Sequence, residues 1–81
     1  MEQEEVFGMI KSERDYQNNK WGEEFDVLNT PNDWVAYITA YAGKAVTLPW
    51  DKDAFRDSML KVATLAVAVL EREDYAPRHY D

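Results

Sequence analysis

Hydrophobic positions recur every three or four residues along three stretches of the 81-residue chain, the spacing of helices with a buried face. We expect helices over roughly residues 3–20, 31–46 and 51–73. The last stretch is unusual, because residues 62–70 are apolar nearly all round the helix and need cover on several sides. The other two helices are too few to supply that cover. The pattern predicts an all-α, three-helix small domain that packs as an oligomeric helical bundle, with the third helix central.

The first expected helix changes character halfway along its length. Its N-terminal half carries an apolar face made of Val6, Phe7, Met9 and Ile10. The same face continues by threes and fours into polar residues, which are Glu13, Arg14 and Gln17. A face of this kind either leaves the core or lines a polar cavity. Leaving the core is the commoner outcome, and we expect it here.

Cap residues define where the second and third helices begin. Thr30 is expected to cap the second helix, with Pro31 at the first helical position and Asp33 as the acid of a capping box. Either Asp51 or Asp53 is expected to cap the third helix.

The size of the chain indicates a single domain, residues 1–81, with little room for a core. So short a chain leaves much of its surface exposed, and its stability is expected to be marginal. The chain has no cysteine, so disulfides and thiolate metal sites are excluded and oligomerisation remains. We therefore expect a homo-oligomer, dimer or tetramer, with a tail (residues 74–81) that is loose or rests on a partner. The expected oligomer core consists of Ile38, Val62, Leu65, Ala66 and Val69.

Nine basic and sixteen acidic residues give the chain a net charge of −7. A field of that sign repels phosphate backbones and anionic lipid, so we expect no nucleic-acid partner and no membrane partner. The longest apolar stretch, residues 62–70, is far shorter than the ~20 residues needed to cross a bilayer. The acidic residues 1–5 are unlike the start of a signal peptide. These features predict a cytoplasmic protein.

Several short motifs together carry a family resemblance. They are the ERDYQ of residues 13–17, the KWG of residues 20–22, the TPNDW of residues 30–34 and the apolar helix of residues 34–45. This combination resembles the MazG-like, all-α nucleoside triphosphate pyrophosphohydrolases, especially short phage-type members. The resemblance spans nearly the whole chain and implies a cleft between the second and third helices that faces the first.

In that family a Glu-x-x-Glu pair on one helix and a Glu-x-x-Asp pair on the next hold Mg²⁺ against the triphosphate. The matching positions here are Tyr41, Lys44, Ser58 and Lys61. Neutral hydroxyls are poor Mg²⁺ ligands, and a lysine ammonium repels the ion. The resemblance therefore implies a scaffold without metal ligands. We expect no cofactor, with Mg²⁺ needed only if pyrophosphohydrolase activity remained.

Three interpretations of the polar residues are open. In the first, they form solvated faces and salt bridges, such as Lys44 or Lys61 with Glu13. In the second, lysines replace the metal and the cleft binds a nucleotide or phosphate without hydrolysing it. The candidate residues of that anion pocket are Glu13, Arg14, Gln17, Lys20, Tyr41, Lys44, Ser58 and Lys61.

In the third interpretation, the protein is an assembly or regulatory module that acts through its aromatic surface. A residual pyrophosphohydrolase is the least favoured alternative, because the matching carboxylates are absent. Enzymatic activity is therefore left open, and the sequence argues against it.

Overall fold

The computed structural model describes residues 1–21, 28–47 and 50–76. These residues form three helices and no strand: α1 (Gln3–Trp21), α3 (Pro31–Val46) and α4 (Lys52–Glu71). The predicted all-α, three-helix architecture is thereby confirmed. The helix bounds differ from the expected ones by two residues at most.

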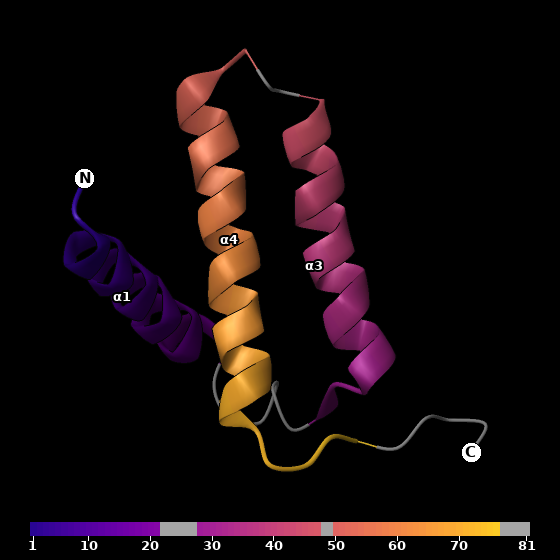
Figure 1. Cartoon of the computed structure of the whole chain (residues 1–81). Coiled ribbons are helices and arrows are strands. Elements are labelled where there is room, and N and C mark those ends of the chain that lie inside the picture. The colour runs from indigo at the N-terminus through magenta and orange to yellow at the C-terminus, as the bar shows by residue number, and fades with distance from the viewer. Residues whose placement is uncertain (22–27, 48–49, 77–81) are drawn as a thin grey trace.

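The helices are arranged around α4 (Figure 1). Helix α3 runs antiparallel to α4 and lies along one side of it, and α1 crosses obliquely on the other side. Helix α1 approaches α4 through its C-terminal half, while its N-terminal end points away. Only α4 therefore has a neighbour on two sides.

The predicted caps are present at both helix starts. Thr30 and Asp33 form the capping box of α3: the Asp33 amide donates to Thr30 Oγ1 at 3.2 Å, and the Thr30 amide donates to Asp33 Oδ2 at 2.9 Å. Of the two candidates for α4, Asp51 is the cap, since its Oδ1 accepts from the Ala54 amide at 3.1 Å. These bonds satisfy amides that a helix start leaves without an intrahelical partner.

The segment after α4 turns back along the bundle. The Tyr75 hydroxyl donates to the carbonyl of Val69 at 2.7 Å, and the Ala76 amide donates to the carbonyl of Asn29 at 3.3 Å. The tail, residues 74–81, was expected to be loose or to rest on a partner. Its described part, residues 74–76, instead lies against this chain. Residues 77–81 lie outside the described residues.

The three helices enclose a small core. Among the described residues, the buried hydrophobic side chains are Trp34, Ala45 and Ala68. The accessible surface is 6140 Å², whereas a compact monomeric protein of 9.5 kDa is expected to expose about 5,000 Å². The radius of gyration is 13.7 Å, against about 12 Å for a compact domain of this length. The single chain therefore has a larger accessible surface and a larger radius of gyration than a compact monomer of its size.

Candidate functional site

A polar cluster lies where the three helices come together. The ammonium group of Lys61, on α4, donates to the carboxylate of Glu13, on α1. Asp57, one turn before Lys61, lies 3.9 Å from the same ammonium. Tyr41 of α3 is close enough to act on Lys61 electrostatically. The cluster thus contains residues from every described helix.

The environment of Lys61 favours its charged form. Partial burial opposes the charge and by itself lowers the pKa of Lys61. The hydrogen bond that Lys61 donates to Glu13, the charges of Glu13 and Asp57 and the nearby Tyr41 act in the other direction and prevail, so that the pKa is raised above 10.5. Lys61 is therefore a cation already paired with carboxylates of this chain, not one available to bind an anion.

A second ion pair joins α1 to the end of α4. Arg14 Nε donates to both carboxylate oxygens of Glu71 at 3.3 Å, and Arg14 Nη1 donates to Asn18 Oδ1 at 3.1 Å. Arg14 is buried, with 8% of its surface exposed. A buried guanidinium needs such partners, because an unpaired charge away from water is costly.

These pairs overturn the expectation that the polar half of the first helix leaves the core. Arg14 is buried and Glu13 and Gln17 are half-buried, whereas Val6 and Phe7 at the apolar end are exposed. The physical reason is the oblique crossing of α1, which presses only its C-terminal half against α4 (Figure 1). The polar half is tolerated there because ion pairs satisfy its charges.

The candidate anion pocket is only partly assembled. Glu13, Tyr41 and Lys61 come together, and Ser58 is buried on α4 a short distance along the same helix. The remaining candidates are dispersed: Lys44 and Lys20 are exposed, Arg14 pairs with Glu71, and Gln17 is half-buried on α1. Lys20 Nζ lies 5.8 Å from the ring centre of Tyr16. Of the two expected pairings for Glu13, the one with Lys61 is present.

Two grooves run along α4 in the described part of the chain. The larger, with a volume of about 610 Å³, lies between the N-terminal half of α1 and the N-terminal half of α4. Its lining combines apolar residues such as Met9, Ile10, Phe55 and Met59 with the charged Asp53, Arg56 and Asp57. The smaller, of about 380 Å³, lies between α3 and the C-terminal half of α4, and includes Val35, Ile38, Ala66, Val69 and Leu70. Neither groove is lined by any residue of the candidate anion pocket.

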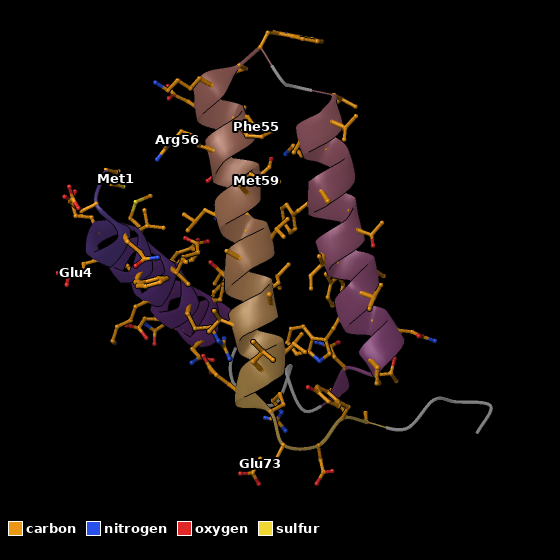
Figure 2. All side chains as sticks on the ribbon, in the orientation of Figure 1. Met1, Glu4, Phe55, Arg56, Met59 and Glu73 are labelled. Atoms are coloured by element: carbon orange, nitrogen blue, oxygen red, sulfur yellow. The ribbon has the colours of Figure 1, made fainter. Side chains whose placement is uncertain are left out.

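Helix α4 presents an apolar stripe, which we define as Phe55, Met59, Val62, Ala66 and Val69. Its first two members line the larger groove and its last two line the smaller one. Its members are separated by four, three, four and three residues, so they share one face of the helix. Phe55 and Met59 are exposed and the other three are half-buried. Figure 2 places Phe55 and Met59 one above the other along α4, with Arg56 projecting toward the side of α1.

Phe55 and Met59 are the residues that the sequence interpretation missed. The heptad-like spacing that contains them is visible in the sequence, but the oligomer core on α4 was predicted only from the apolar run of residues 62–70. The five expected oligomer-core residues are all half-buried in the single chain: Ile38, Val62, Leu65, Ala66 and Val69. Their assignment to an oligomer core stays a prediction.

Comparison of the chain with protein-family models, with curated proteins and with solved structures finds no match. The resemblance to MazG-like proteins therefore stays a hypothesis. Within residues 1–21, 28–47 and 50–76, no three acidic, histidine or cysteine side chains are grouped so that they could hold a metal ion. None of the described helices combines the length and the apolar character that crossing a membrane requires.

Proposed function

We propose that this chain is a non-catalytic, cytoplasmic assembly module that works by self-association through its helices. The observation that carries the proposal is the accessible surface, which exceeds that of a compact monomeric protein of the same mass by roughly 1,100 Å². A standard protein–protein interface takes about 800 Å² from each partner. The excess is thus of the size that one interface removes.

The exposed side chains agree with this interpretation. Large hydrophobic residues lie at the surface of all three helices, including Phe7 on α1, Val35 on α3 and Leu70 on α4. Leu70 has 82% of its surface exposed. Large exposed apolar areas on a soluble protein mark interaction sites. The MazG-like resemblance fits the same proposal, as a helical scaffold whose metal-ligand positions hold other residues.

The anion-pocket alternative has less support. Binding a phosphate at Lys61 would require the anion to displace Glu13, and Asp57 would repel it. Lys44 is exposed on α3, and no ion pair joins it to the polar cluster among the described residues. The geometry therefore favours the interpretation in which these polar residues link helices.

Sedimentation of the purified chain at micromolar concentration tests the proposal. We expect a dimer or tetramer that dissociates on dilution, since the interface is built from one surface of a small protein. A monomer throughout the micromolar range would refute self-association. Incubation with nucleoside triphosphates and Mg²⁺ or Mn²⁺ supplies the second arm, in which we expect the triphosphates to survive. Pyrophosphate release that is lost in a Lys61→Glu variant would instead revive the enzyme alternative.

A further inference from the structure

Two neighbouring faces of α4 differ in polarity. The stripe defined above is apolar at every position, from Phe55 to Val69. The neighbouring face, which contains Ser58 and Lys61, holds the polar groups and meets the other helices of the chain. The face of α4 that is buried within the single chain is therefore the more polar one. The all-apolar stripe is covered only in part: Phe55 and Met59 are exposed, and Val62, Ala66 and Val69 are half-buried.

We propose that a second copy of this chain lays its own α4 antiparallel along this stripe, about a two-fold axis near Val62 and Ala66. This inference rests on the proposed function and specifies its interface. The alternation of four- and three-residue steps is the spacing by which two helices interlock side chains over several turns. A two-fold pairing is self-complementary, so the exposed ridge of each copy meets the open grooves of the other and the assembly closes.

The ends of α4 favour a second copy in the antiparallel orientation. The last turn of α4 contains no basic residue, while Arg72 follows it as the C-cap residue and Glu71 pairs with Arg14 of α1. The first turns contain Lys52 and Arg56 besides Asp53 and Asp57. An antiparallel copy brings the positive end of its helix dipole toward the negative end of the dipole of the first copy. A parallel copy would place like dipole ends together.

Small residues at the proposed axis permit close approach. Ala66 is half-buried at the middle of the stripe, and Ala63 lines the larger groove beside it. The bulkier Phe55 and Met59 lie toward one end of the stripe, where they line the groove against α1. An antiparallel partner therefore offers its small centre to the small centre of the first copy.

Single-cysteine variants test this arrangement, because the chain has no cysteine of its own. A two-fold axis brings equal positions together only near the axis. We expect Val62→Cys or Ala66→Cys to form a disulfide-linked dimer under mild oxidation, and Leu70→Cys at the end of the helix to stay unlinked. Ala40→Cys is the matched control for Ala66→Cys, since Ala40 is exposed on α3 and lies outside both grooves.

Sedimentation of the native chain and of each reduced variant accompanies the cross-linking. If the native chain is a monomer, the proposed function fails and this interface fails with it. If the native chain is oligomeric but neither central cysteine links faster than Ala40→Cys, the proposed function stands and the α4 interface is refuted. Cross-linking of Leu70→Cys as fast as Ala66→Cys would refute the antiparallel orientation.

Discussion

The ammonium group of Lys61 lies between a carboxylate of α1 and one of α4, with Tyr41 of α3 nearby. This geometry explains how the charge of a partly buried lysine is compensated in the folded chain. The positive charge meets Glu13 directly, and these two residues, 48 positions apart in the sequence, join α1 to α4. At this position the residue types favour a link between helices over a site for phosphate.

Glu13→Gln is expected to lower the free energy of unfolding by about 1–2 kcal/mol, between the values typical of exposed and of buried ion pairs. The reason is that Glu13 and Lys61 have only 16% and 23% of their side chains exposed, so the ammonium loses its main compensation. Urea denaturation measures the change. Asp15→Asn is the control, because the Lys11–Asp15 pair is exposed and should contribute little. Equal effects of the two substitutions would contradict the role given to Glu13.

Stability should also fall at high pH in a way that depends on Lys61. Its pKa is raised in the folded chain, so its contribution to stability is fully present below the unfolded value of 10.5. The contribution is then lost as the pH rises through the folded pKa. We expect the difference in unfolding free energy between the native chain and Lys61→Gln to be constant up to about pH 10 and to shrink above it. A difference that grew with pH would contradict the raised pKa.

At the scale of elements, local side-chain interactions specify where α3 and α4 begin. The capping box at Thr30 and the cap at Asp51 each act through side chains within three residues of the helix start. Such local interactions can be predicted from the sequence alone, and the caps at both positions were among the alternatives it predicted.

Thr30→Ala is expected to cost about 1 kcal/mol of stability, because the Asp33 amide at the start of α3 loses its acceptor, Thr30 Oγ1. Thr30 is buried, so water replaces that bond poorly. Thr39→Ala serves as the control, since Thr39 is exposed inside α3 and alanine is the better helix former. Chemical denaturation of both variants should show a loss only for Thr30→Ala.

The placement of α1 was beyond prediction from sequence pattern. Its apolar N-terminal half was expected in the core, yet its polar half is the buried one. The crossing of α1 over α4 depends on contacts between distant residues, such as Arg14 with Glu71, which are 57 residues apart. Periodicity identifies a helix face, but it does not specify which half of that face meets a neighbour. The pairing of Glu13 with Lys61 was one of two alternatives that the sequence offered for Glu13, the other being Lys44, and the structure contains the one with Lys61.

At the scale of the molecule, the chain measures 41 × 27 × 20 Å and covers α4 on two sides only. The sequence anticipated this shortage of cover from the run of residues 62–70. The structure adds a direction to it: the apolar stripe of α4 is covered only in part, with Phe55 and Met59 exposed. The proposed burial against another copy would supplement a small single-chain core and cover this stripe.

Two leucines provide a matched test of where that burial occurs. Leu70 and Leu28 have 82% and 75% of their surfaces exposed, so replacing either by serine should cost the single chain little. Leu70 lines the groove between α3 and α4, whereas Leu28 lines neither groove. Burial of a leucine contributes about 1.5–3 kcal/mol, so Leu70→Ser should weaken self-association by roughly tenfold or more. Sedimentation across a dilution series should show no such change for Leu28→Ser, and circular dichroism should confirm equal helix content in both variants. Equal weakening by the two substitutions would locate the interface elsewhere on the molecule.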